Sequence, residues 1–200
     1  MWTVADGLGI HGSYFFRLST LDRAVMSAMS AGGSEVSYHY EELATVAKRR
    51  HLRSASEALA ALPEARDLFA SNLVRLRQST GLPMRIVAAH GDFMNRRLGV
   101  SNSRILDEPT LRRDLGIELE TYDEAFQRHV TSAHTDVPHP LYWDPTDPGS
   151  AMRAGEPLLS VLVHPRHWRA DPLVNARDDA LRIVQGVQHR LPRLRQRPPG

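Results

Sequence analysis

The chain has 200 residues, of which 42% are apolar, and this is enough to bury the core of a single domain. Its 25 basic and 23 acidic side chains are mostly interleaved, so the net charge of +2 indicates no strong long-range field and no nucleic-acid partner. The absence of cysteine excludes disulfides, thiolate chemistry and cysteine-based zinc sites. The N-terminal segment lacks the basic and apolar regions of a signal peptide, and no apolar run reaches about 18 residues, so we expect a cytoplasmic protein without a membrane span.

Short apolar runs alternate along the chain with longer stretches of helical period, which is typical of an α/β protein with a mainly parallel sheet. The first predicted strand covers residues 10–16. A short helix is expected within residues 19–33, where Gly32 and Gly33 provide a stop signal. The strand that it leads to covers residues 35–40.

Helical period returns over residues 54–81, where Pro63 is expected to begin a second helix and Gly81 to end it. Four further strands are predicted, at residues 84–91, 117–122, 128–134 and 158–164. The second of these is the weakest, and the last is the most strand-like run in the chain.

A long segment rich in Pro, Asp, His and Trp, residues 135–157, precedes the last strand and has no periodicity of its own. Loops of this length more often carry functional residues or form a lid than serve only as connections. A closing helix is expected over residues 175–191. We therefore predict one α/β domain over residues 1–190, followed by a basic, disordered tail at 191–200.

Histidine ends several of the predicted strands. These residues are His39, His90, His134 and His164. Asp92 and Asp136 follow two of them by two residues. Because the carboxyl ends of parallel strands meet at one face of a sheet or barrel, we expect these side chains to line a single site there.

Imidazole and carboxylate are the ligands that a divalent transition metal accepts when no thiolate is present. Water bound to such a metal has its pKa lowered toward about 7, and a remaining histidine can act as an acid or base near neutral pH. We expect His39, His90 and His134 to hold the metal, with zinc favoured and cobalt, nickel or iron as alternatives. The plain alternative is that each histidine is a strand-end residue hydrogen-bonded to a loop carbonyl.

Loops beside these strand ends carry side chains that we expect to contact a substrate: His139, Tyr142, Trp143, Arg166, His167 and Trp168. The two tryptophans either pack on the core as part of a lid or stack on a sugar ring. Arg166 or His167 would orient the substrate or a developing oxyanion, where a cation is most useful.

Three segments resemble motifs of the polysaccharide deacetylase superfamily, also called the NodB-homology or carbohydrate esterase family 4 proteins. "DGLGIHGSYFFRLS" is similar to an early strand of that family, and "AGGSEVSYHYEEL" is similar to a segment in which His39 falls where the first metal histidine would stand. "LLSVLVHPRHW" resembles the last motif, in which a strand ends on the histidine that serves as general acid, here His164. The likeness covers most of the chain, from Leu8 to about His189.

The resemblance implies a distorted (β/α)7-type barrel with mainly parallel strands, a divalent metal held by one aspartate and two histidines, and removal of acetyl groups from amino sugars. The chain departs from this pattern at three points. Nothing in it matches the aspartate pair on the first strand of the family, Leu43 stands where the second metal histidine would be, and "AAHGDF" replaces an arginine-proline motif.

Three explanations account for these departures: a chain that lacks the first strand of the family, a divergent branch with different ligands, or a non-catalytic relative. We expect a metal-dependent hydrolase that acts on an acetamide or ester of a carbohydrate or glycoconjugate. In this hypothesis Asp92 or Asp136 completes the metal shell or acts as base, and His164 protonates the departing amine.

The alternative is a carbohydrate-binding or assembly protein that keeps the scaffold without the chemistry. A serine hydrolase or a nucleotide-dependent enzyme is not expected, because the chain has no Gly-x-Ser-x-Gly elbow and no glycine-rich loop in the right context. An open barrel without its first strand would expose two strand edges, so we also expect a homodimer.

Overall fold

The computed structural model describes residues 2–137 and 141–168, and beyond these residues 171, 173, 174, 176, 177 and 180. The chain divides into two compact units, Met1–Val130 and Thr131–Gly200, here called unit 1 and unit 2. The prediction of one domain over residues 1–190 did not anticipate this division. The tail and most of the predicted closing helix lie outside the described residues.

A parallel sheet forms the centre of unit 1. Its strands, in spatial order, are β1 (Ser13–Phe16), β2 (Glu35–Tyr40), β3 (Ile86–Ala89) and β4 (Leu119–Glu120). Each lies within a strand that the sequence predicts, so the α/β class with a parallel sheet is confirmed. The described residues contain no closed barrel, and the finer prediction of a (β/α)7-type barrel is therefore not confirmed.

Helices precede, connect and follow these strands. They are α1 (Trp2–Gly7), α2 (Arg23–Ala31), α3 (Glu42–Arg50), α4 (Ala55–Ala60), α5 (Leu62–Thr80), α6 (Phe93–Leu98), α7 (Pro109–Asp114) and α8 (Glu124–Gln127), with short 3-10 helices η1 (Leu18–Thr20) and η2 (Asn102–Asp107). Pro63 lies in the first turn of α5, as predicted, because a missing N–H costs nothing there. Gly81 ends α5 at a φ of 73°, a left-handed conformation that glycine adopts without strain.

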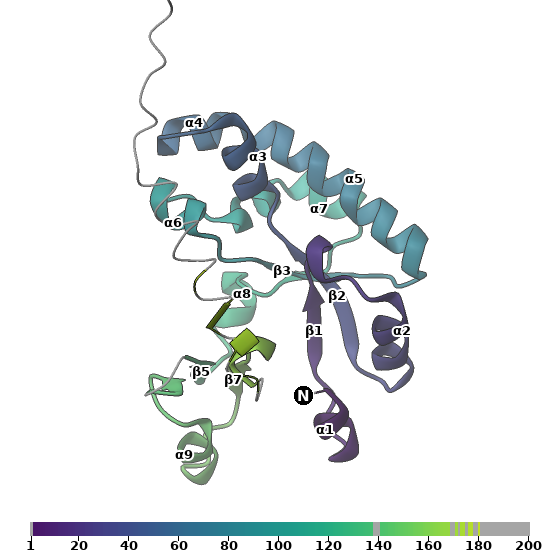
Figure 1. The fold of residues 1–200 in the computed structure, drawn as a ribbon, viewed down its shortest axis with the longest axis vertical. Coiled ribbons are helices and arrows are strands. Elements are labelled where there is room, and N and C mark those ends of the chain that lie inside the picture. The colour runs from purple at the N-terminus through teal and green to yellow at the C-terminus, as the bar shows by residue number, and fades with distance from the viewer. Residues whose placement is uncertain are drawn as a thin grey trace, which may run out of the picture. The chain divides into compact units, whose positions relative to one another are not determined.

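The core of unit 1 lies between the sheet and helices α3 and α5, which pack side by side (Figure 1). Alternate residues of β2 enter this core, among them Tyr38 and Tyr40, because successive side chains of a strand point to opposite faces. The fully buried ring of Phe69, on α5, lies 6.0 Å from the Tyr38 ring and 5.0 Å from the Tyr40 ring. His39, between the two tyrosines, belongs to the opposite face of the sheet.

Unit 2 is built on a smaller mixed sheet of order β6-β5-β7. Its elements are β5 (Ser132–Asp136), β6 (Trp143–Asp144), α9 (Pro148–Arg153), β7 (Leu159–Leu162) and the 3-10 helix η3 (Pro165–Trp168). The β5 and β7 strands are parallel, and β6 is antiparallel to β5. The segment 135–157, which the sequence suggested was a loop, thus contains a short strand and a helix.

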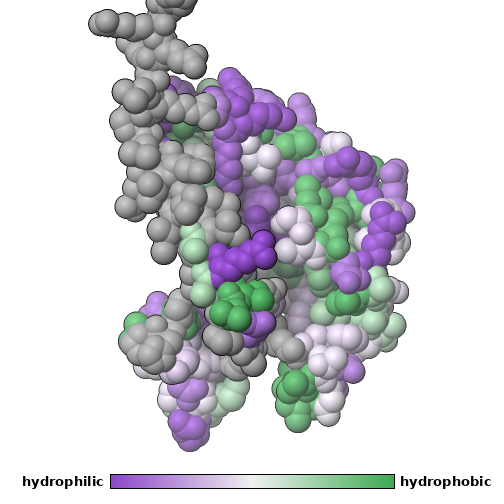
Figure 2. Space-filling view, viewed as in Figure 1, coloured by the Kyte–Doolittle hydropathy of each residue, from purple (hydrophilic) through white to green (hydrophobic). Residues whose placement is uncertain are grey.

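Exposed apolar side chains of unit 1 gather at its N-terminal end. Val4 is 64% exposed, Leu8 69% and Ile10 56%, and Figure 2 shows hydrophobic surface where Figure 1 places α1. Strand β1 is at the end of the described sheet, so its outer edge pairs with no other described strand. The homodimer stays a prediction. Among the described residues, no helix combines the length and apolar character needed to cross a bilayer.

A buried carboxyl group on β4 makes the stability of unit 1 depend on pH. Glu120 is 2% exposed and accepts hydrogen bonds from the backbone N–H groups of Ala89 (2.8 Å) and Tyr122 (2.7 Å) and from the Tyr40 hydroxyl (3.3 Å). Burial raises the pKa of Glu120, and the nearby Asp123 carboxylate raises it further. The folded state therefore binds this proton more tightly than the unfolded state does.

We predict that the wild-type free energy of unfolding falls as the pH rises above the ordinary glutamate value of 4.5, and that Glu120→Gln removes this part of the fall. Each unit by which the pKa is raised corresponds to about 1.4 kcal/mol at neutral pH. Urea unfolding between pH 4 and pH 8 would measure the difference, with the exposed Glu124→Gln as the control. Parallel curves for wild type and Glu120→Gln would contradict the prediction.

Candidate functional site

Two groups of potential metal ligands occur among the described residues, one in each unit. Asp136, His164 and His167 form the group in unit 2, here called the Asp136 cluster. Glu41, His90 and Asp92 form the group in unit 1, here called the Glu41 cluster. Within each group, one ligand atom from every residue lies within 4.8 Å of the others.

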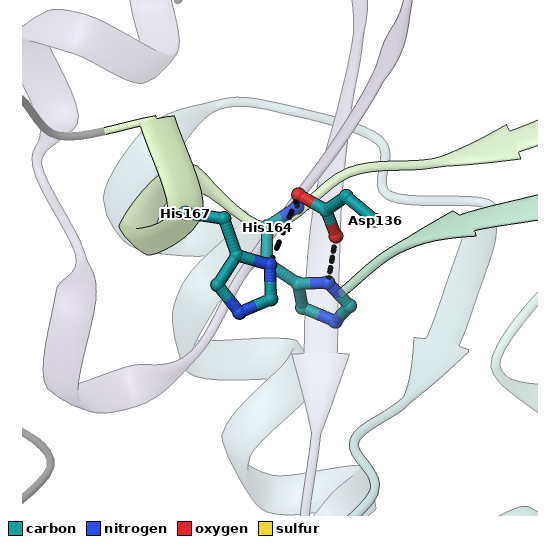
Figure 3. Close-up of side chains that lie close together, drawn as sticks. All are labelled: Asp136, His164 and His167. Atoms are coloured by element: carbon teal, nitrogen blue, oxygen red, sulfur yellow. Dashed lines mark hydrogen bonds and ion pairs between the residues drawn. The ribbon is translucent and has the colours of Figure 1, made fainter. Parts of the chain in front are cut away.

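The Asp136 cluster is assembled by the parallel pair β5 and β7. Asp136 is the last residue of β5, His164 follows β7 by two residues, and His167 lies in η3. Asp136 accepts two hydrogen bonds from His164: Oδ1 lies 2.6 Å from the ring Nδ1, and Oδ2 lies 2.8 Å from the backbone nitrogen. Figure 3 shows both imidazole rings beside the carboxylate of Asp136. His164 is thus held at two points, and its Nε2 is left to act on something else.

His167 is the residue of this cluster whose surroundings are incomplete. Its side chain is 14% exposed, and both ring nitrogens are buried without a hydrogen-bond partner among the described residues. Asp136 Oδ2 lies 3.2 Å from His167 Nδ1, but not with hydrogen-bond geometry. A buried polar atom without a partner costs about 1–3 kcal/mol, so this imidazole is a candidate for binding a ligand.

His134, which the sequence suggested was a third metal ligand, has a different role. It lies inside β5 and is 3% exposed. Its Nε2 is 2.8 Å from the Ser132 hydroxyl and its Nδ1 is 2.7 Å from the carbonyl oxygen of Thr146. Both nitrogens therefore have partners within the fold, and this histidine fits the plain alternative of a satisfied structural residue.

An aromatic residue pairs with the Asp136 cluster in the sheet of unit 2. Trp143 on β6 is the register partner of Asp136 on β5. Tyr142, which precedes it, is 59% exposed and has a positive φ of 60°. Of the other predicted substrate contacts, His139 and the side chains of Arg166 and Trp168 lie outside the described residues, so their roles stay predictions.

In unit 1, the residue directly after each of three neighbouring strands is polar. Arg17 follows β1, Glu41 follows β2 and His90 follows β3. Arg17 Nη2 lies 3.0 Å from Oε1 and 2.8 Å from Oε2 of Glu41, and His90 Nδ1 lies 3.2 Å from the same Oε2. Burial alone would raise the pKa of Glu41, but the contacts with His90 and Arg17 outweigh it and lower the pKa to about 2.

Asp92 already has two partners. Its Oδ1 accepts a hydrogen bond from the backbone N–H of Met94 at 2.8 Å, so it caps the N-terminus of α6. Its Oδ2 lies 2.5 Å from Lys48 Nζ. The sequence suggested that Asp92 is a base or a metal ligand, and the structure shows a helix cap in an ion pair.

His39 lies against His90 but is not part of the Glu41 cluster. The two rings meet edge to face with centroids 4.9 Å apart, and His39 Nδ1 is 3.0 Å from the carbonyl oxygen of Ala88. Burial lowers the pKa of His39 to about 4, so the ring is neutral at pH 7. A neutral ring that donates from Nδ1 keeps a lone pair on Nε2.

The predicted strand-end residues are thus brought together in pairs: His39 with His90 in unit 1, and Asp136 with His164 in unit 2. The sequence argument missed Glu41 and Arg17. Both directly follow a predicted strand, so the convergence of strand ends could have identified them if the prediction had not been confined to histidines and the aspartates after them. No family model matches this chain, and no curated protein or solved structure matches it either.

The loop that carries His90 depends on one buried amide, Asn102, which is fully buried. Its Nδ2 donates to the carbonyl oxygen of His90 (2.7 Å) and to Asn95 Oδ1 (2.9 Å), and its Oδ1 accepts from the backbone N–H of Ala44 (3.0 Å). This one side chain therefore ties the end of β3 to α3.

We predict that Asn102→Ala lowers the free energy of unfolding by about 2 kcal/mol or more, because it leaves buried backbone groups without partners. Urea unfolding followed by circular dichroism would measure the loss. The exposed Thr110→Ala is the control and should change stability by less than about 0.5 kcal/mol. A change of that small size in Asn102→Ala would mean that the loop is held by other contacts.

Proposed function

We propose that this protein is a metal-dependent hydrolase with Asp136, His164 and His167 as the metal ligands. The observation that carries the proposal is His167, a buried imidazole whose two nitrogens have no hydrogen-bond partner among the described residues. A bound cation would give one of these nitrogens the partner that the polypeptide does not provide. Of the candidate metals, zinc suits two imidazoles and a carboxylate, with cobalt, nickel and iron as alternatives.

The distances support a fit to such an ion. Two ligands bound to zinc at about 2.0–2.2 Å, with tetrahedral or octahedral angles, lie about 2.8–3.6 Å apart. The 3.2 Å between His167 Nδ1 and Asp136 Oδ2 falls in this range. A metal held there would act as a Lewis acid that polarises the carbonyl of an amide or ester. Three protein ligands would leave coordination positions open for the substrate, as is typical of catalytic rather than structural sites.

Asp136 has a second task in this proposal. Its Oδ1 lies 2.6 Å from His164 Nδ1, and a cation bound there would take the place of the proton that these two atoms share. Its Oδ2 accepts the backbone N–H of His164 at 2.8 Å, which holds this histidine in place before a ligand binds and lowers the entropic cost of binding.

The proposed substrate is an acetamide or ester of a carbohydrate or glycoconjugate. Two features support this class. The segments around His39 and His164 resemble those of polysaccharide deacetylases, and Trp143 lies opposite Asp136 in the sheet, where its ring could stack on a sugar. We also propose that the fold is a divergent form of the barrel found in that superfamily. We further propose that the protein acts in the cytoplasm.

A second candidate mechanism is favoured by the 2.6 Å bond between Asp136 and His164. In it no metal binds in unit 2, and His164, oriented by Asp136, protonates the departing amine or alcohol, as the resemblance implies for this position. A third candidate is the carbohydrate-binding or assembly protein without chemistry.

The test is to measure metal content and acetate release on protein purified without a histidine tag. We expect His167→Ala to retain one ion fewer per chain than wild type. We also expect it to release acetate from an N-acetylated chito-oligosaccharide at least about 100-fold more slowly, since Lewis-acid catalysis contributes several kcal/mol. The exposed His129→Ala is the matched control and should retain both the metal and the rate.

Asp136→Asn separates the candidate mechanisms. If activity survives removal of metal with a chelator but is lost in Asp136→Asn, the acid–base pair is the mechanism and the metal proposal is wrong. If wild type releases no acetate but still binds the oligosaccharide in calorimetry, the non-catalytic candidate is favoured.

A further inference from the structure

We propose that the carboxyl ends of β2 and β3 form a second divalent-metal site, with Glu41, His90 and Asp92 as ligands. This inference does not depend on the Asp136 cluster, which lies in the other unit. The location is the edge of a parallel sheet at which residues following successive strands converge, and where ligands of α/β proteins bind. The three ligand atoms lie within 4.8 Å of one another.

Two atoms of this cluster face each other without hydrogen-bond geometry. Glu41 Oε2 and His90 Nδ1 are both buried, and Oε2 is in an ion pair with Arg17 Nη2 at 2.8 Å, whereas Nδ1 has no hydrogen-bond partner among the described residues. They lie 3.2 Å apart, and two ligands of one zinc ion are separated by about 2.8–3.6 Å. A cation between the end of β2 and the end of β3 would therefore give His90 Nδ1 a partner and would replace Arg17 as the positive charge beside Glu41 Oε2.

Lys48 holds the place of a cation when no metal is bound. Its Nζ lies 2.5 Å from Asp92 Oδ2 and 5.1 Å from the centre of the Phe93 ring. It is the only lysine in the chain, where the other basic residues are arginines. A lysine ammonium is a compact point charge on a flexible stem, so it can leave a carboxylate more readily than a bidentate arginine can.

The lysine side chain can withdraw, because it is 35% exposed and its end can move into water. Arg17, 33% exposed, neutralises Glu41 in the same way. A metal must therefore compete with both cations for their carboxylates, and removing one competitor should tighten metal binding. If the ion pair between Lys48 and Asp92 has a purely structural role, removing Lys48 should lower stability and should not tighten metal binding.

The first experiment uses the single lysine as a reporter. Reductive methylation with 13C-labelled formaldehyde keeps the positive charge and places an NMR signal on Lys48 and on the N-terminus of the full chain. We expect addition of Zn²⁺ to shift the Lys48 signal in wild type and in His167→Ala, which lacks the unit 2 site. We expect no shift in His90→Ala or in Glu41→Gln. An unchanged Lys48 signal in wild type, with Zn²⁺ present at millimolar concentration, would overturn the proposal.

The second experiment measures Zn²⁺ and Co²⁺ binding by calorimetry on the same variants. We expect His167→Ala to bind one ion and Lys48→Met in that background to bind it about tenfold or more tightly, by analogy with the size of other changes around metal sites. Arg53→Met, an exposed position in unit 1, is the control and should leave the affinity unchanged. Weaker or equal binding in Lys48→Met would show that the lysine and Asp92 form only a structural ion pair.

These outcomes separate this proposal from the proposed function. Loss of the ion in His167→Ala together with an unresponsive Lys48 would leave the hydrolase proposal intact and remove the second site. If His167→Ala keeps its full metal content and this binding depends on His90, the second site is supported and the metal-dependent hydrolase proposal is wrong. If His90→Ala fails to fold, Glu41→Gln, which keeps the shape of the side chain, gives the same information.

Discussion

The parallel hydrogen bonding of β2 to β3 is the constraint on which the chemistry of unit 1 depends. The backbone N–H of His90 donates to the carbonyl oxygen of Tyr40 at 2.8 Å, which continues the ladder one residue beyond the two strands. This bond brings together the residues that follow the two strands. Glu41 therefore meets His90, which lies 49 positions further along the chain. Asn102 holds the loop after β3 in place by donating a hydrogen bond to the carbonyl oxygen of His90.

The same arrangement occurs in unit 2 with different residues. The parallel pair β5 and β7 places Asp136 beside the backbone nitrogen of His164, which is 28 residues away in the sequence. In both units a carboxylate at the end of one strand orients a histidine just beyond the end of its neighbour. The recurrence follows from geometry, because parallel strands deliver their last residues to one edge whatever the sequence.

Much of the secondary structure could be predicted because its signals are local. Apolar runs located β2 and β3, and Pro63 and Gly81 marked the start and end of α5. The pairing of Glu41 with Arg17 and the division at residue 130 could not be predicted, because they depend on contacts between segments far apart in the chain. Closure of a barrel is a property of the whole sheet, and periodicity carries no information about it.

The error at His134 has a more specific cause. The predicted strand ended at this residue, whereas β5 continues to Asp136, so His134 is an interior strand residue whose neighbours are fixed by the sheet. Because the strand ends two residues later than predicted, the His134 side chain keeps its face of the sheet but lies within the strand and not at its carboxyl end. The residue that does stand at the end of β5 is the aspartate, and the sequence had placed it among the catalytic candidates.

The contrast between His134 and His167 is the strongest argument that the Asp136 cluster is a functional site. Both are histidines of unit 2 and both are mostly buried, at 3% and 14% exposure. The fold supplies a hydroxyl and a carbonyl to the two nitrogens of His134, yet it supplies a hydrogen-bond partner to neither nitrogen of His167 among the described residues. A buried imidazole without hydrogen bonds lowers the stability of the fold by about 1–3 kcal/mol. That cost is repaid if His167 gains its partner only when a ligand binds, and the neighbouring carboxylate and the oriented ring of His164 make a metal cation the ligand that this group of atoms fits best.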